Sequence, residues 1–225
     1  NYASNAEGGE GVANDCRNEG VKAVAVGANV ADDADCRRLA AAAIDAWGRI
    51  DVLVNNAGTT KFHPHAELEG VSAEDFHQLY SVNTIGAFQM IRAVAPTMQQ
   101  TGGSIVNVAS VAGVIGVGSS LAYACSKAAL LAINLSMARN LGPAIRVNAV
   151  CPGFIQGRWT KNFLGENYEA VNKQFEEGSA LKKTAVPEDV AKSIVHLVCD
   201  AQLVTGEITI IDGGSTLGQV TMNRR

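Results

Sequence analysis

The sequence predicts a doubly wound α/β fold, in which helices cover both faces of one parallel sheet in a single three-layer α/β/α domain. Two observations favour it. Short runs of β-branched residues alternate along the chain with longer segments of helical period. Most of the short runs are continuously apolar, which is typical of parallel strands buried on both faces. We therefore expect residues 1–225 to form one domain around one core.

Five short runs are predicted to be the strands of this sheet. The first, at residues 21–26, is rich in valine and alternates with a helical segment that follows it. The other four contain too few polar residues to have one wet face. They comprise residues 50–54, 104–108, 145–150 and 208–211.

Helices are predicted between the strands from their period and their cap residues. Ser72 has Asp75 three residues later, a near capping box that begins a helix. Pro187 suits the first turn of another helix. The predicted helices comprise residues 32–47, residues 72–98, a helix from 119 or 120 to 141, and a helix that begins at residue 187.

Residues 154–186 interrupt the alternation with aromatic, glycine and charged residues, and we interpret them as a substrate lid within the domain. Trp159, Phe163 and Leu164 belong to this segment. They suit packing of the lid and equally suit a wall for an apolar or acyl substrate, so both readings stay open.

Composition indicates which partners to expect. Hydrophobic residues make up 47% of the chain and charged residues 18%, and the net charge is −4. No run of lysine and arginine is long enough to follow a phosphate backbone, and no apolar run approaches the length of a membrane span. We therefore predict neither a nucleic-acid partner nor a membrane partner.

The cysteines, the first residues and the histidines favour a cytoplasmic protein without a catalytic metal. Five scattered cysteines include no C-x-x-C pair, and Asn1-Tyr2-Ala3-Ser4 does not resemble the start of a signal peptide. His63 and His65 could chelate a metal, but no third ligand stands at a suitable spacing, so a surface loop is the preferred interpretation.

Tyr123 and Lys127 are the first candidates for chemistry. Four residues apart on a helix, their side chains lie on one face and can reach a common ligand. A cation beside a phenol favours the phenolate, so Lys127 is predicted to lower the pKa of Tyr123 toward the range of a general acid or base. This spacing alone also occurs on helices where a solvated lysine stands beside a half-buried tyrosine.

Ser110 strengthens the catalytic interpretation. It stands at the end of the segment Ile105-Val-Asn-Val-Ala-Ser110, just after the predicted strand at residues 104–108, so it lies at the carboxyl edge where open α/β sheets bind ligands. Its hydroxyl can hold a substrate carbonyl. A loop with Gly113, Gly116 and Gly118 then leads to Tyr123 and lets the backbone approach a ligand closely.

With these residues the chain resembles the short-chain dehydrogenase/reductase family, which has a Rossmann-like fold. The family's serine stands thirteen positions before the tyrosine of its Tyr-x-x-x-Lys motif, as Ser110 does before Tyr123. Asn55-Asn56-Ala57-Gly58 follows a predicted strand as the family's Asn-Asn-Ala-Gly does. Asn83 falls at the family's fourth catalytic position. Pro152-Gly153 follows a predicted strand as in the family, and residues 205–214 resemble the family's last strand and turn.

The resemblance implies catalytic roles. Tyr123 donates or accepts the substrate proton, and Lys127 lowers its pKa while it hydrogen-bonds the nicotinamide ribose. Ser110 orients the carbonyl, and Asn83 holds a water that links Lys127 to solvent.

The resemblance also implies a dinucleotide site, in which Tyr123 and Lys127 take part. Asn56, Ala57 and Gly58 line the adenine ribose, and Asn29-Val30 contacts the adenine. Many family members have Asp where this chain has Asn29, and an amide can also hydrogen-bond the base. The residues expected at the nicotinamide are Pro152, Gly153 and Ile155.

The family's first strand, its Thr-Gly-x-x-x-Gly-x-Gly turn and the following helix come before a segment like Asn1 to Ser4, and the sequence does not contain them. Gly8, Gly9 and Gly11 have a different spacing and suit the start of a polar helix. A fold without that unit lacks its central strand and the helix that binds the pyrophosphate, and exposes an apolar edge. We expect the working protein to have a complete nucleotide site.

The resemblance implies a reductase of the 3-oxoacyl-[acyl-carrier-protein] reductase type. NADP is favoured over NAD because Asn1 to Ser4 contains no acid to bind the ribose hydroxyls, although NAD stays possible. A dehydrogenase of a sugar, polyol or steroid alcohol and a non-catalytic dinucleotide-binding subunit remain alternatives. Family resemblance also implies a homotetramer, with helices at residues 73–98 and 120–141 at one interface and the C-terminal region at another.

Overall fold

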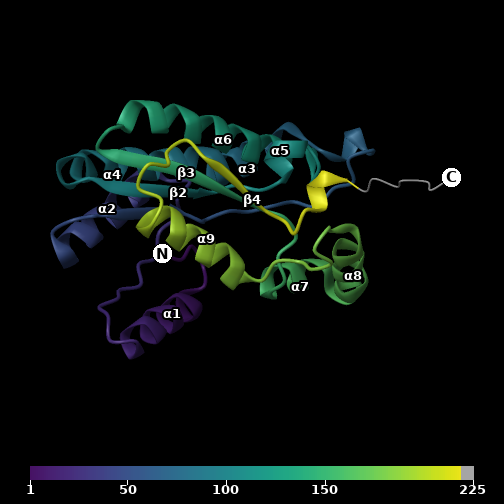
Figure 1. Ribbon diagram of the computed structural model, residues 1–225, viewed down its shortest axis with the longest axis horizontal. Coiled ribbons are helices and arrows are strands. Elements are labelled where there is room, and N and C mark those ends of the chain that lie inside the picture. The colour runs from purple at the N-terminus through teal and green to yellow at the C-terminus, as the bar shows by residue number, and fades with distance from the viewer. Residues whose placement is uncertain (219–225) are drawn as a thin grey trace.

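The computed structural model describes residues 1–218, and its centre is one parallel sheet (Figure 1). Its strands lie in the order β1-β2-β3-β4, and all neighbouring pairs are parallel. The four continuously apolar runs are confirmed as strands to within two residues. The strands are β1 (Val52–Asn55), β2 (Gly103–Val108), β3 (Ile145–Pro152) and β4 (Ile208–Ile211).

The predicted strand at residues 21–26 is wrong. The segment has no regular secondary structure, and one isolated bridge, between Gly27 and Tyr2, lies next to it. Val21 and Val24 are exposed. A strand needs a hydrogen-bonded neighbour along its length, and no second strand flanks this segment among residues 1–218.

Helices occupy the connections, as predicted. Asp32 caps α2 through Ala34 and Asp35, and Ser120 rather than Ser119 caps α6 through Tyr123. The main helices are α1 (Ala6–Asn18), α2 (Asp33–Trp47), α3 (Ala73–Tyr80), α4 (Ala87–Thr101), α5 (Ala112–Ile115), α6 (Leu121–Leu141), α7 (Arg158–Leu164), α8 (Tyr168–Gly178) and α9 (Pro187–Cys199). Short 3-10 turns cover Leu68–Gly70, Gly165–Asn167 and Ser215–Leu217.

The helix predicted from Ser72 is interrupted. Ser72 and Asp75 form the expected capping box at the start of α3. A π-helical turn, η2 (Ser81–Gly86), then separates α3 from α4. This turn contains Asn83, and π-turns inside helices are frequent at functional sites.

The three predicted layers are present (Figure 1). α4 and α6 cover one face of the sheet, with α2 packed against α4, and α9 covers the other face. Strand alternation divides the core accordingly, because Ile105 joins the cluster under α4 and α6 while Val106 joins the cluster under α9. The α/β class is therefore confirmed.

β1 is an edge strand, and α9 packs against β2 and β3 rather than β1. Val52 and Val54 consequently keep 40% and 39% of their surface exposed. An exposed apolar edge strand of this kind can pair with another strand.

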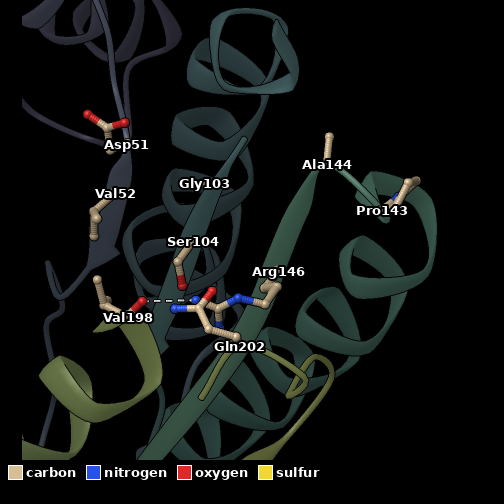
Figure 2. A pocket seen from close by; sticks show the side chains of 9 residues that line it. All are labelled: Asp51, Val52, Gly103, Ser104, Pro143, Ala144, Arg146, Val198 and Gln202. Carbon is tan, nitrogen blue, oxygen red and sulfur yellow. Dashed lines mark hydrogen bonds between the residues drawn. The ribbon is translucent and has the colours of Figure 1, made fainter. Parts of the chain in front are cut away.

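A cavity of about 440 Å³ lies at the amino ends of the strands (Figure 2). Its main charged group, Arg146, donates to carbonyl oxygens at the end of α9, including those of Leu197 at 2.7 Å and Val198 at 2.9 Å. The guanidinium therefore acts as a helix cap. The Ser104 hydroxyl lines the same cavity and has no hydrogen-bond partner within residues 1–218.

Candidate active site

The predicted site residues gather at the opposite edge of the sheet, where the parallel strands end. Asn56 follows β1, Ser110 follows β2, and Gly153 follows β3. The segments after β2 and β3 are tied together, because the Val111 amide donates to the Pro152 carbonyl at 3.1 Å. This arrangement follows from the parallel sheet, since all strands end at the same side.

α6 presents Tyr123 and Lys127 to this edge. The helix begins at Ser120, whose hydroxyl accepts a hydrogen bond from the Tyr123 amide at 3.2 Å. Tyr123 is half-buried, and Lys127 is only 4% exposed. The ammonium nitrogen of Lys127 lies 5.9 Å from the centre of the Tyr123 ring and donates to the Val108 carbonyl at 2.8 Å.

Gly113 brings the Ser110 segment against α6. A Cβ at this position would lie 2.6 Å from the carbonyl carbon of Lys127 and 2.7 Å from the Ala128 nitrogen, both backbone atoms. Only a residue without a side chain permits α5 to pack this closely on α6. The close packing of α5 on α6 therefore sets the distance between Ser110 and Tyr123, whose side chains interact.

Burial controls the protonation of both central residues. It raises the pKa of Tyr123, and the hydrogen bond with Ser110 lowers that pKa in part. The net direction is opposite to the lowering predicted from Lys127, because loss of water around the phenol dominates. Burial also lowers the pKa of Lys127 to about 8.

Asn83 joins the group from the π-turn. Its side-chain oxygen accepts from the Thr59 amide at 2.8 Å, and its nitrogen donates to the Thr59 carbonyl at 2.9 Å. A Cβ on Gly58 would lie 3.4 Å from the Asn83 oxygen and 3.6 Å from the Lys127 nitrogen. The four predicted catalytic residues are thus within one neighbourhood.

Sequence reasoning missed Ser126. Its buried hydroxyl accepts a hydrogen bond from Asn83 at 3.0 Å and donates to the Tyr123 carbonyl at 2.8 Å. Ser126 therefore connects the π-turn with the tyrosine's own turn of helix. Its spacing of three residues after Tyr123, which brings it next to Tyr123 on a helix, is the signal available in the sequence.

Residues predicted to line the adenine and its ribose come together from distant parts of the sequence. Val30 and Ala57 line one small hollow with Asn55, Gly86 and Ala87. Asn29 lies beside it, but its side-chain oxygen accepts from the Ala31 amide at 3.1 Å and so closes a local turn.

The residues predicted to meet the nicotinamide lie where the predicted lid at residues 154–186 begins. The Gly153 amide donates to the Ile211 carbonyl at 2.9 Å, and a Cβ on Gly153 would lie 2.8 Å from the Asp212 Cβ. Ile155 forms an isolated parallel bridge with Ala185, which joins the two ends of the lid segment.

Aromatic side chains form two groups in and around α7 and α8. Phe154 stacks on Phe175 with ring centres 4.9 Å apart, and this pair holds α8 to the segment that follows Gly153. Phe62, Trp159 and Phe163 form a second group, in which Phe62 meets Phe163 edge-to-face at 5.3 Å. All three are exposed, and we call them the aromatic shelf.

Phe62 belongs to a loop that is held against the start of α6. The Thr60 hydroxyl forms a short hydrogen bond with the Ser119 hydroxyl, and the His63 amide donates to the Ser119 carbonyl at 2.7 Å. The imidazole of His65 contacts the Gly118 carbonyl at 3.1 Å. Across residues 1–218, no group of three or more His, Cys, Asp or Glu side chains could hold a metal ion.

α6 is long and apolar enough to cross a membrane by length and composition. It is also the helix that packs along β3, and its buried residues Leu130 and Leu131 belong to the cluster with Ala149 and Cys151. The core of the fold accounts for its apolar composition.

Comparison with known proteins gives the same assignment as the geometry. A family model described as Enoyl-(Acyl carrier protein) reductase matches residues 2–216. The structure is similar to that of a putative short-chain dehydrogenase/reductase from Burkholderia xenovorans, with a TM-score of 0.88 and 35% identity over 97% of this chain and 86% of that one. This protein belongs to the short-chain dehydrogenase/reductase family.

Curated relatives in this family have several activities. Granaticin polyketide synthase putative ketoacyl reductase 2 from Streptomyces violaceoruber is 40% identical over 87% of this chain and 78% of its own length. The 3-oxoacyl-[acyl-carrier-protein] reductase of Thermotoga maritima is 39% identical over 83% and 74%. L-rhamnose 1-dehydrogenase (NAD(P)(+)) of Azotobacter vinelandii is 36% identical over 87% and 76%.

As a short-chain dehydrogenase/reductase, the protein is an oxidoreductase that acts on carbonyl or alcohol groups with an NAD(P) dinucleotide. The structure fits that group at the strand ends. Ala57 and Gly58 present backbone and little side chain beside Lys127, and Val30 and Gly86 border the neighbouring hollow. Small residues at these positions allow a ribose and a flat base to approach the backbone.

Proposed function

We propose that this protein is an NADPH-dependent reductase of 3-oxoacyl thioesters. The observation that carries the proposal is the placement of Ser110 and Tyr123 together at the carboxyl edge of the sheet, with Lys127 one helical turn beyond Tyr123. Two converging hydroxyls can both donate to one carbonyl oxygen, which orients the carbonyl and stabilises negative charge that develops on it.

Each residue then has a defined task. The bound dinucleotide supplies the hydride. Ser110 donates a hydrogen bond to the carbonyl oxygen, and Tyr123 transfers its proton to the same oxygen. The raised pKa of Tyr123 keeps the phenol protonated at neutral pH, which is the state that a proton donor needs. Lys127 hydrogen-bonds the nicotinamide ribose, and Asn83 holds a water that links Lys127 to solvent.

We assign the cofactor contacts from the positions of the residues at the carboxyl edge of the sheet. Asn56, Ala57 and Gly58 line the adenine ribose, while Asn29 and Val30 border the adenine. Pro152, Gly153 and Ile155 meet the nicotinamide. NADPH is preferred because residues 1–4, which lie beside Gly27 through Tyr2, contain no acid to repel a 2′-phosphate. We expect kcat/KM with NADPH to exceed that with NADH by about tenfold or more, and equal values would contradict the preference.

The aromatic shelf supports an acyl substrate. Phe62 and Phe163 come from two different segments, the first from the loop after Asn56 to Gly58 and the second from the proposed lid at residues 154–186. Exposed aromatic faces offer apolar surface on which an acyl chain can be buried. The Thermotoga maritima and Streptomyces relatives point to the same substrate class, and the Azotobacter vinelandii relative supports a sugar dehydrogenase as the alternative.

A paired assay tests the proposal. The protein is incubated with NADPH and a 3-oxobutanoyl thioester, and separately with NADP⁺ or NAD⁺ and L-rhamnose, while absorbance of the reduced nicotinamide is followed. Faster reduction of the thioester supports the proposal. Turnover of the sugar alone favours the alternative, and dinucleotide binding without either turnover favours a non-catalytic subunit.

The proposal includes a cytoplasmic homotetramer. All five cysteines are free thiols, which agrees with a reducing compartment. Ile85 and Phe88, near the start of α4, and Leu121 and Leu135 on α6 are exposed apolar residues that suit burial between subunits. The C-terminal interface would also include residues 219–225, which lie outside the described residues. Analytical ultracentrifugation tests the assembly, and a monomer at micromolar concentration would contradict it.

A further inference from the structure

Three buried asparagines form a directed chain of hydrogen bonds, which we call the amide relay. Asn55 donates from its side-chain nitrogen to the Asn107 oxygen at 2.9 Å, and Asn107 donates to the Asn134 oxygen at 3.1 Å. Asn134 then donates to the Glu207 carbonyl at 3.2 Å. The relay connects β1, β2, α6 and the residue before β4.

The relay lies in an apolar interior. Asn107 and Asn134 have no exposed surface, and Asn55 is 8% exposed. Amide groups in such a place cost stability unless they are hydrogen-bonded, and each amide here satisfies the next. The bonds also have one direction. Rotation of one amide by 180° would place nitrogen against nitrogen or oxygen against oxygen, so each side chain is held in one orientation.

The relay ends at the proposed cofactor site. Asn55 is the last residue of β1 and stands directly before Asn56, Ala57 and Gly58. It also lines the hollow with Val30 and Ala57, and its nitrogen makes a second, longer bond of 3.4 Å to the Ala87 carbonyl. The orientation of Asn55 therefore influences the direction in which the backbone leaves the sheet.

We propose that Asn107 and Asn134 are positioning residues for the dinucleotide, which act through Asn55 on Asn56 to Gly58. This inference rests on the proposed function, in which those three residues line the adenine ribose. Asn134 lies on α6, beyond Asn107 in the relay, so a change there affects cofactor binding only if the relay transmits it.

The test compares Asn134→Val with Asn134→Thr. The two side chains have nearly the same shape, but the threonine hydroxyl can accept from Asn107 and donate to the Glu207 carbonyl, whereas valine can do neither. The Glu207 carbonyl keeps its bond from the Ala149 amide at 2.8 Å in both variants. In Asn134→Val, the Asn107 nitrogen loses its acceptor, and Asn107 is no longer held toward Asn55.

We expect Asn134→Val to raise the Kd and KM for NADPH by about tenfold, the effect of one good hydrogen bond, with kcat within about twofold of the wild type. Asn134→Thr should restore most of the affinity. Kd is measured by quenching of protein fluorescence, so this readout requires no substrate. If Asn134→Val does not fold, Asn134→Leu fills more of the volume and replaces it in the comparison.

Asn148→Val is the matched control. Asn148 is also fully buried, donates to the Val204 carbonyl at 3.0 Å and accepts from the Glu207 amide at 3.0 Å. It supports the same segment before β4 but takes no part in the relay. We expect this variant to lower Tm with little change in the Kd for NADPH.

The outcomes separate the two proposals. An equal rise in Kd for Asn134→Val and Asn148→Val, or no rise for Asn134→Val, would overturn the positioning role. A wild type that binds NADPH but reduces no 3-oxoacyl thioester would contradict the proposed substrate, while the Kd comparison would still decide the relay. A wild type that binds neither NADPH nor NADH would overturn both.

Discussion

Lys127 donates a hydrogen bond from its buried ammonium to the carbonyl oxygen of Val108, 2.8 Å away. A single carbonyl replaces only part of the hydration that a lysine has in water, so burial lowers the pKa of Lys127 to about 8. The same burial makes this lysine unfavourable for folding at neutral pH. Its presence in the core is consistent with a role in chemistry rather than stability.

Lys127→Met should stabilise the fold and abolish activity. Below pH 8 the lysine is charged in both folded and unfolded states, and the fold bears the full cost of its burial. Between about 8 and the ordinary value of 10.5, the unfolded chain holds a proton that the folded chain has released, so wild-type stability rises relative to the variant. We expect the variant's higher Tm at pH 7 to converge with the wild type near pH 10. A Tm difference independent of pH would contradict the buried charge.

Tyr123→Phe should remove the proton donor and little else. We expect turnover to fall by about 10²- to 10⁴-fold, the usual contribution of a positioned acid or base. The Kd for NADPH should stay close to the wild-type value. Tyr80→Phe, on α3, is the control and should retain turnover. Wild-type kinetics in Tyr123→Phe would exclude the mechanism.

Gly113→Ala should separate α5 from α6. The new Cβ would meet backbone atoms of Lys127 and Ala128 at 2.6 and 2.7 Å, which cannot move away as a flexible side chain can. We expect a loss of about 1–3 kcal/mol in unfolding free energy and a large loss of kcat. Gly11→Ala, in α1 with no neighbour within 4 Å, should instead be neutral or slightly stabilising. Urea unfolding of both variants measures the contrast.

Lys61→Met should make the protein more sensitive to acid. The Lys61 ammonium lies 2.6 Å from the Asp75 carboxylate, and with the Ser72 bonds it lowers the pKa of Asp75 to about 2. This contribution to stability is present above pH 4 and is lost as pH falls toward 2. Removing the ammonium raises the pKa of Asp75, so the loss should begin at higher pH. Tm measured from pH 2 to 5 tests this, with Lys22→Met as an exposed control, and identical acid profiles would contradict it.

Phe163→Ala should lower specificity for longer acyl chains. The ring lies between Phe62 and Trp159 in the aromatic shelf, and its removal breaks the contact between the lid and the loop. We expect kcat/KM for an eight-carbon 3-oxoacyl thioester to fall more than that for a four-carbon one. Phe175→Ala, which disturbs the inner stack on Phe154, is the control. An equal loss of kcat/KM for both chain lengths in Phe163→Ala would show that the aromatic shelf does not recognise the acyl chain.

Local sequence patterns predicted the four strands of the sheet and part of the candidate site. Strands β2 and β3 could be predicted because burial on both faces demands continuous apolar residues. Ser72 and Ser120 mark helix starts because their hydroxyls cap the next turn. Residues 21–26 carry the same local pattern but form no sheet strand, because pairing depends on a neighbour that composition does not reveal. Helical periodicity also does not predict the π-turn at Asn83.

The sequence by itself determined the spacing of Tyr123 and Lys127, because helix geometry turns four residues into one shared face. It also placed Ser110 at the carboxyl edge, because every strand of a parallel sheet ends there. Only the tertiary structure decided how these groups behave. The pKa of Tyr123 is raised because the surrounding elements exclude water, and Ser126, Gly113 and the amide relay act through partners brought together by folding. Desolvation and close contact depend on every element packed around a group, so they appear only when the chain is folded.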